Sequence, residues 1–175
     1  MNTWTASVRE SLMSREHRRA MLPPDTNKVA ASDLERAMNS ILADVIALYR
    51  KTTSFYWHMR GPRAHEHHLV LDEQTEQLYA MTDEMVEHIR NMGGEMLRSI
   101  GLIIGMRRHI VDEDAGAYIE PSDMLAELRE DNKLLGARLR DALDACNDHG
   151  DIEIAQWIEI WIHKTECRNY QLIEA

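Results

Sequence analysis

Hydrophobic positions along the chain follow a helical period in four separate stretches. Apolar side chains recur there every three or four residues, the spacing that places them on one face of an α-helix. The first two stretches carry Leu34, Met38, Ile41, Val45 and Leu48, and then Leu71, Leu78, Met81, Met85 and Ile89. The last two carry Leu125, Leu128, Leu135, Leu139 and Leu143, and then Ile154, Trp157, Ile158, Trp161 and Ile162. The pattern predicts four amphipathic helices and a helical core.

Capping and breaking residues mark where these helices begin and end. Ser32 and Glu35 form a capping box, which is typical of a helix start. Gly93 and Gly150 suit the left-handed position that follows a helix end. The four helices are therefore predicted over residues 32–59, from 63–65 to 93, from 121 or 122 to 150, and from 151 almost to 175.

The predicted helices belong to one domain with a long central connection. Residues 95–118 link the second and third helices and contain a short helical piece over residues 97–110 and an acidic loop. Four helices of similar length with a long link in the middle favour a ferritin-like four-helix bundle, all-α in class, over residues 32–175. Residues 1–31 lack the period and contain two consecutive prolines, so they are predicted to form a flexible, mildly basic tail.

Composition and charge narrow the class further. The 175 residues include only 8 Gly, 4 Pro and 1 Phe, and most of the others favour helices. This residue usage disfavours an all-β fold. With 30 acidic against 20 basic residues the net charge is −10, so the surface as a whole repels nucleic acid. DNA contact is therefore expected only from the tail, or else the tail is a solvated segment that helps assembly. Its candidate phosphate contacts are Arg9, Arg15, Arg18 and Arg19.

Two cysteines and the absence of long apolar runs indicate the compartment. Cys146 and Cys167 have no partner motif and are expected to be free thiols that pack in a reducing environment. No stretch approaches the ~18 apolar residues that a membrane span requires. The protein is therefore expected to be soluble and cytoplasmic, and nucleoid-associated if it binds DNA.

One face of the second predicted helix carries a histidine and three carboxylates. At 100° per residue, His68, Asp72, Asp83 and Glu87 fall within an arc of about 100°, opposite the core stripe. The same arc includes Leu69, Tyr79 and Val86, and such a mixture favours a buried interface over a solvated face.

The spacing of these four side chains points to two copies of the chain. Asp72 and Glu87 lie ~22 Å apart along the helix, too far for one metal ion. Two antiparallel helices related by a twofold axis near residues 77–78 would bring His68 and Asp72 of one copy to Asp83 and Glu87 of the other. Imidazole and carboxylate ligands favour Fe(II), Mn(II) or Zn(II). No Glu-x-x-His motif occurs, which disfavours a di-iron site inside one bundle.

One long stretch of the sequence resembles the signature region of the Dps family, the DNA-binding proteins from starved cells, also called mini-ferritins. This stretch is LADVIALYRKTTSFYWHMRGPRAHEHHLVLDEQTEQLYAMTDEMVEHIRNMGG. The resemblance continues through MLAELREDN and covers about residues 30–175. It implies a hollow dodecamer, a ferroxidase site at the twofold interface, oxidation of Fe(II) preferentially by hydrogen peroxide, and storage of ferric iron. In some members of the family, basic tails bind DNA.

The resemblance also assigns ligands, with one departure. The family's second histidine and its carboxylates fall on His68, Asp72, Asp83 and Glu87, whereas the first histidine falls on Tyr56. Tyr56 either weakens or alters iron binding, or a nearby histidine, His65 or His67, fills the gap, or the site is adapted to zinc. Trp57 takes up oxidising equivalents, as in relatives, or simply packs in the core.

Two functions of different class follow from these observations. The first is a ferroxidase and iron store that consumes Fe(II) and peroxide and protects DNA and the cell from oxidative stress. The second is a DNA-associating or structural shell whose metal site is degraded or adapted to zinc. The acidic residues at the turn between the third and fourth predicted helices fit either of two interpretations. They could line an ion entrance at a threefold axis, or they could simply reflect the preference of a helix start for negative charge. They are Asp148, Asp151 and Glu153.

Overall fold

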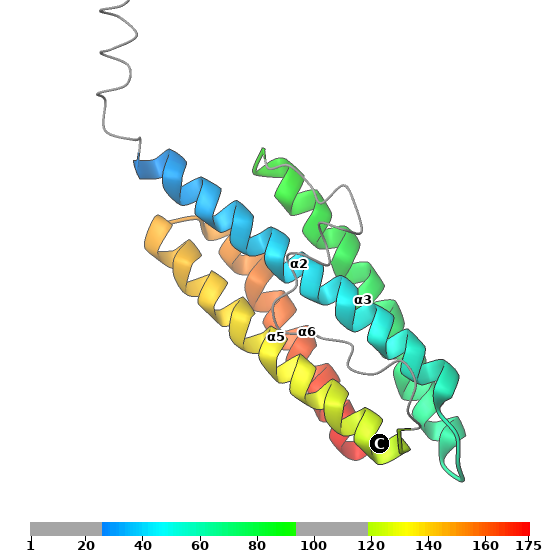
Figure 1. The fold of residues 1–175 in the computed structure, drawn as a ribbon. Helices are drawn as coiled ribbons and strands as arrows, with labels where there is room; N and C mark the ends of the chain where they lie inside the picture. Colours follow the sequence, from blue (N-terminus) through cyan, green and yellow to red (C-terminus); the bar gives the residue numbers. More distant parts are fainter. Residues whose placement is uncertain (1–25, 94–118) are drawn as a thin grey trace, which may run out of the picture.

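A computed structural model describes residues 26–93 and 119–175 of the chain, and within these ranges every element is an α-helix. The helices are α2 (Thr26–His58), α3 (Ala64–Asn91), α5 (Pro121–His149) and α6 (Ile152–Glu174) (Figure 1). The predicted all-α class with four main helices is therefore confirmed. The short helix predicted over residues 97–110 and the first 25 residues of the predicted tail lie outside the described residues.

The start of α2 differs from the prediction. The helix begins at Thr26, so Ser32 lies inside it rather than at its N-cap. A capping box is a local signal, and the residues before it include helix formers such as Lys28, Ala30 and Ala31 that allow the helix to continue through it. The last six residues of the predicted tail are accordingly helical.

The other helix boundaries follow the predicted signals. Gly93 and Gly150 adopt left-handed φ angles of 75° and 74°. Gly93 is the second residue after the end of α3, and Gly150 is the first residue after the end of α5. Pro121 occupies the first position of α5, where its missing N–H costs nothing. Asp151 caps α6, because its side chain accepts a hydrogen bond of 3.3 Å from the backbone N–H of Ile154.

The four helices form a bundle of two antiparallel pairs. α2 packs against α3, α5 against α6, α2 against α5, and α3 against α6. The end of α3 and the start of α5 lie at opposite ends of the bundle, so these two helices run in the same direction (Figure 1). These helix directions are those of the ferritin-like topology, in which a long connection joins the second and third helices. Within the described ranges, no helix combines the length and apolarity needed to cross a membrane.

The predicted apolar stripes make up the core. All five stripe residues of α2, all five of α3, and Leu125, Leu128, Leu135 and Leu139 of α5 are buried, as are Ile154, Ile158 and Trp161 of α6. Leu143, Trp157 and Ile162 are half-buried at its margin. Sequence periodicity therefore identified the interior face of every helix.

The two cysteines differ in their environments. Cys146 is fully buried, and burial together with the charge of Asp151 raises the pKa of its thiol to about 11. Cys167 is exposed on α6, with Sγ 3.7 Å from Nε2 of His163. Both are free, as predicted, but the expectation that both are packing residues is wrong for Cys167, whose position on α6 faces away from the core.

A buried ion pair joins α2 to α5. Nζ of Lys51 donates hydrogen bonds of 2.8 Å to Oδ2 of Asp131 and 2.6 Å to Oε1 of Glu127, and the side chains of Lys51 and Asp131 are almost completely buried. Burial on its own would lower the pKa of Lys51, but the hydrogen bonds and charges of the two carboxylates outweigh it and raise that pKa. The ammonium group therefore stays charged inside the bundle.

Removing this lysine is expected to destabilise the fold strongly. Lys51→Met leaves the carboxylate of Asp131 buried without its cation, and we expect the free energy of unfolding to fall by about 3–5 kcal/mol. Adding Asp131→Leu to Lys51→Met should restore much of the loss. Urea unfolding followed by circular dichroism measures both variants.

Lys133→Met is the matched control. Lys133 pairs with Glu130 at 2.6 Å on the exposed face of the same α5 helix, so its loss should change the free energy of unfolding by less than about 1 kcal/mol. If Lys51→Met and Lys133→Met lowered the free energy of unfolding equally, the stabilising role of the buried Lys51 ion pair would be contradicted.

Candidate metal centre

The four predicted ligands lie on the outward face of α3, opposite its buried stripe. His68 is half-buried, and Asp72, Asp83 and Glu87 are exposed. His68 and Asp72 are one turn apart, as are Asp83 and Glu87, but the two pairs are separated by roughly 22 Å of helix. One chain therefore presents two separate candidate half-sites, each with two predicted ligands: His68 with Asp72, and Asp83 with Glu87.

His68 is held in place by Tyr56. Its Nε2 donates a hydrogen bond of 3.0 Å to the backbone carbonyl of Tyr56, and the two rings lie 4.7 Å apart at 46°. Because a carbonyl only accepts, the proton is on Nε2, and Nδ1 keeps its lone pair for a ligand. A histidine oriented by a backbone carbonyl is the usual arrangement at metal sites. Sequence reasoning placed Tyr56 beside the ligands but did not predict this contact.

The neighbouring histidines differ in their availability. His65 is exposed and lies on the same outward arc as Asp83. His67 is buried and directed to the other side of α3, where its Nε2 donates to the carbonyl oxygen of Ala175 at 3.2 Å. His67 is therefore not placed to assist His68, and His65 is the histidine that stays a candidate.

Large apolar side chains surround the half-sites on α2 and α3. Trp57 is 65% exposed, Leu69 61% and Tyr79 57%. The ring of Tyr79 packs at a tilt against the ring of half-buried Tyr49, with 6.0 Å between the ring centroids. Trp57 therefore does not pack in the core of the single chain, and this face leaves a large apolar area uncovered.

The interior between α3, α5 and α6 contains a cation. Arg168 is fully buried, and its guanidinium donates 3.2 Å to Oδ1 of Asn132 and 2.8 Å to Oγ1 of Thr165. Burial lowers the pKa of Arg168 to about 10, so it is still charged at neutral pH. Among the described residues of one chain, no group of three or more His, Cys, Asp or Glu side chains gathers to hold a metal ion. The fixed positive charge of Arg168 makes this part of the interior unsuitable for a metal ion.

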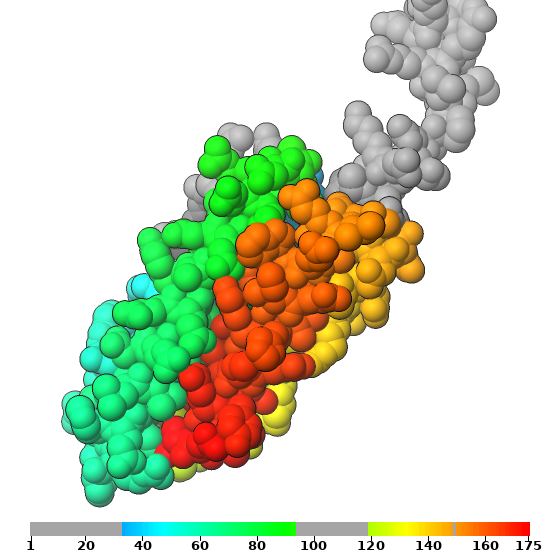
Figure 2. All heavy atoms as spheres, turned by 180° about the vertical axis from the view of Figure 1, so that it is seen from behind, coloured from blue at the N-terminus to red at the C-terminus, as the bar shows by residue number. Residues whose placement is uncertain are grey.

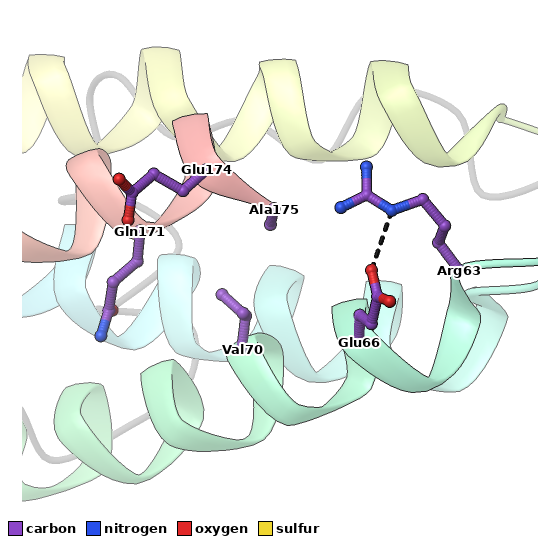
Figure 3. Close-up of a pocket in the computed structure, with 6 residues that line it drawn as sticks. All are labelled: Arg63, Glu66, Val70, Gln171, Glu174 and Ala175. Carbon is purple, nitrogen blue, oxygen red and sulfur yellow. Dashed lines mark hydrogen bonds and ion pairs between the residues drawn. The ribbon is translucent and has the colours of Figure 1, made fainter.

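An open pocket of about 230 Å³ lies at the end of the bundle where α3 begins and α6 ends (Figure 3). Arg63 and Glu66 form an ion pair of 2.9 Å on one side and face Ala175 across the opening. Among the described residues, its lining includes no histidine and only two carboxylate side chains, Glu66 and Glu174, and Glu66 is already paired. The pocket is therefore separate from the candidate metal centre.

The acidic residues predicted as an ion entrance lie around the turn between α5 and α6. Asp148 and Glu153 are exposed, whereas Asp151 is half-buried and serves as the cap of α6. The arginines of the tail, namely Arg9, Arg15, Arg18 and Arg19, lie outside the described residues. The entrance and the DNA contacts therefore stay predictions.

Glu84 ties α3 to α6 beside the second half-site (Figure 2 shows the two helices side by side). Its carboxylate accepts 2.9 Å hydrogen bonds from Nε1 of Trp161 and Nζ of Lys164. Burial would raise the pKa of Glu84, but Lys164, Trp161 and the charge of His88 outweigh it and hold that pKa below its usual value. Glu84 thus fixes the segment of α3 that carries Asp83 and Glu87, and no local sequence signal identifies a contact that spans 77 residues.

Residues 35–175 match the family model of the ferritin-like domain. Because the match covers most of the chain, the chain belongs to the ferritin family. It is also 30% identical over 111 residues to a low temperature-induced protein of Nostoc sp., an alignment that covers 63% of this chain and 61% of that protein. The chain thus aligns with only about three fifths of the length of that relative.

Within the ferritin family, the similarity is to Dps proteins, as the sequence resemblance predicts. The chain is 25% identical over 114 residues to the DNA protection during starvation protein of Helicobacter pylori, which covers 65% of this chain and 78% of that protein. Its fold matches Dps from Thermosynechococcus elongatus with a TM-score of 0.80 at 17% identity, covering 86% and 94% of the two chains. DpsC from Streptomyces coelicolor matches with a TM-score of 0.77 at 21% identity, covering 88% and 87%.

The Glu84 interaction predicts a pH-dependent effect on stability. Because the pKa of Glu84 is lower in the folded chain than in the unfolded one, its stabilisation is complete above its unfolded pKa and is lost as the pH falls through its folded pKa. Glu84→Gln should therefore lower the free energy of unfolding by about 1 kcal/mol at pH 6 and by progressively less toward pH 3. Unfolding curves of both proteins across this range measure the difference.

Glu166→Gln provides the control, since Glu166 pairs with Arg140 on the exposed surface of α6 and α5. The free energy of unfolding of this variant should stay close to that of the parent protein at both pH 6 and pH 3. A constant deficit of Glu84→Gln from pH 6 to pH 3 would show that the carboxylate charge is not what joins α3 to α6.

Proposed function

We propose that the chain is a Dps-like mini-ferritin that binds Fe(II), oxidises it with hydrogen peroxide at sites shared by two copies, and stores ferric iron in a hollow dodecamer. The ferritin-like domain and the similarity to Dps proteins support this function. In this proposal the protein is a cytoplasmic ferroxidase that limits oxidative damage to DNA and the cell.

The observation that carries the proposal is the pair of half-sites on one outward face of α3. They are related by a centre between residues 77 and 78, so an antiparallel second copy would set His68 level with Glu87 of the partner subunit, and Asp72 level with Asp83 of the partner subunit. Each dimer would then have two equivalent sites, each with one imidazole and three carboxylates.

The exposed apolar residues support an interface at the same place. Trp57, Leu69 and Tyr79 flank the half-sites, and a second copy packed on α2 and α3 would remove them from water. Burial of apolar area contributes roughly 25 cal/mol per Å², which favours this face for association. The dimer would thereby complete the metal ligands and cover the apolar surface in one step.

The ligand set fits Fe(II) as a substrate. Carboxylates at Asp72, Asp83 and Glu87 attract a divalent cation and favour the harder Fe(III) even more, which assists the loss of an electron. Two Fe(II), one peroxide and two protons give two Fe(III) and two waters, so the reaction needs no further reductant. The Tyr56 carbonyl would keep Nδ1 of His68 directed to the metal. Manganese and zinc share these ligand preferences and are competitors for the site.

Tyr56 favours a second candidate function. In place of the family's first histidine it leaves one nitrogen ligand fewer, and its ring packs on His68. The alternative is a structural or DNA-associating shell with a degraded or zinc-adapted site. His65, exposed on the same arc, is the candidate to replace the missing nitrogen. Trp57, beside Tyr56, is proposed to take up stray oxidising equivalents.

The tail and the turn between α5 and α6 complete the proposal. In the assembled shell, many copies of the basic tail would multiply weak phosphate contacts, which salt would weaken. Asp148, Asp151 and Glu153 are proposed to guide cations through an entrance where three copies meet.

Mixing two inactive variants tests the shared site. Each site of a His68→Ala/Asp72→Ala homodimer, or of an Asp83→Ala/Glu87→Ala homodimer, has only half of its ligands, so we expect both to oxidise Fe(II) no faster than buffer. Co-assembly gives heterodimers in about half of the pairs, each with one intact site, and should restore about a quarter of the parent activity. The assay loads about two Fe(II) per chain without oxygen, adds half an equivalent of peroxide, and follows ferric absorbance.

The same samples are passed over a sizing column to test iron retention. Mixing the variants after assembly, without exchange of chains, is the control and should stay inactive. If the co-assembled sample stays inactive while the parent protein is active, the site does not lie between copies. A parent protein that neither oxidises nor retains iron would favour the structural or DNA-associating shell.

Restoring the missing ligand tests the role of Tyr56. Tyr56→His adds a nitrogen while keeping the backbone carbonyl that orients His68, so we expect at least a several-fold faster oxidation of Fe(II) by peroxide. Tyr170→Phe, an exposed change on α6, should leave the rate unchanged. A Tyr56→His rate equal to that of the parent protein would remove Tyr56 from the metal centre.

A further inference from the structure

Tyr79 is an exposed aromatic residue that the metal centre does not use. It lies on α3 about 20° from His68, inside the arc of the ligands, and 1.5 residues from the centre between residues 77 and 78. It is 57% exposed in the single chain. In the dimer of the proposed function, on which this inference rests, Tyr79 therefore faces the partner subunit.

The twofold axis brings the two copies of this tyrosine together. Because equivalent side chains emerge on the same side of the two antiparallel helices, the two Tyr79 positions are offset by only about 4–5 Å along the helix axis. Tyr49 supports the ring from behind, with 6.0 Å between centroids and an angle of 49° between planes. Two phenols would thus lie side by side, each backed by a second tyrosine.

The pair also lies between the two metal sites. Tyr79 is seven residues from Asp72 and eight from Glu87, which corresponds to about 10–12 Å along the helix on either side. Electrons tunnel over such distances in proteins. A phenol at this place is therefore within reach of oxidising equivalents formed at either site.

We propose that Tyr79 and Tyr79 of the partner subunit form a redox pair that takes up excess oxidising equivalents and then closes into a dityrosine cross-link. When a site holds one Fe(II), that ion gives peroxide one electron, and Tyr79 gives the second electron and a proton. With one more proton from solvent, the products are Fe(III), a phenoxyl radical and two waters. The two radicals join through the ring carbons ortho to the carbons that bear the phenol oxygens, and the hydrogen on each coupled carbon moves to the phenol oxygen of its ring.

Limiting iron and excess peroxide test the pair in the assembled full-length protein. We load about one Fe(II) per chain without oxygen, add a several-fold excess of peroxide, and separate the chains on a denaturing gel. A covalent dimer with dityrosine fluorescence is expected, and its linked peptides should be lighter by two hydrogens at Tyr79. Tyr79→Phe should reduce the dimer at least tenfold.

Tyr170→Phe is the matched control, because Tyr170 is 60% exposed but lies on α6, and this variant should cross-link like the parent protein. Parent protein that oxidises iron without forming the dimer overturns the redox pair and leaves the proposed function intact. A dimer that persists in Tyr79→Phe also overturns it.

If the parent protein does not oxidise iron, the proposed function fails, and the pair is tested separately with a light-driven one-electron oxidant in the absence of iron. A covalent dimer that depends on Tyr79 then supports the juxtaposition of the two phenols. No dimer under illumination overturns it.

Discussion

A buried positive charge decides where this bundle can carry metal chemistry. Proteins with a di-iron centre inside a four-helix bundle line the interior with carboxylates and histidines. Here the guanidinium of Arg168 occupies the space between α3, α5 and α6, and it donates hydrogen bonds to Asn132 and Thr165, which are neutral. A divalent cation placed nearby would meet repulsion in a medium of low dielectric constant, where charges interact most strongly. The predicted ligands of α3 lie on its outward face, away from this buried charge.

Placing ligands on an outward face links metal binding to assembly. Two ligands on one helix turn bind a cation weakly, and in the proposed dimer a second copy would supply the remaining carboxylates. By linkage, a metal ion that binds the dimer better than the single chain also stabilises the dimer. The exposed apolar residues Trp57 and Leu69 would act in the same direction, since the proposed partner would cover them too. Ligand geometry and apolar burial thus favour the same interface, and neither depends on the other's chemistry.

Periodicity predicted the fold well because a helix converts sequence spacing into direction. The core stripes, the outward arc of His68, Asp72, Asp83 and Glu87, and the ends at Gly93 and Gly150 all follow from local rules. What spacing did not predict are contacts between distant segments, such as Lys51 with Asp131 and Glu84 with Trp161, which are 80 and 77 residues apart. The start of α2 was mistaken for a similar reason, because a cap signal competes with neighbouring residues that also favour a helix.

The buried thiol of Cys146 bears on how well the protein would tolerate the peroxide that it is proposed to consume. Peroxide attacks thiolates rather than thiols, and a pKa of about 11 leaves only about one thiol in ten thousand ionised at pH 7. The sulfur is also fully enclosed by the core, so the oxidant has neither the reactive form nor a path to it. Sulfenic and sulfinic acids, which would place a polar group in the packed interior, are thereby avoided. The interior of the scaffold is thereby shielded from the reagent that its surface is proposed to consume.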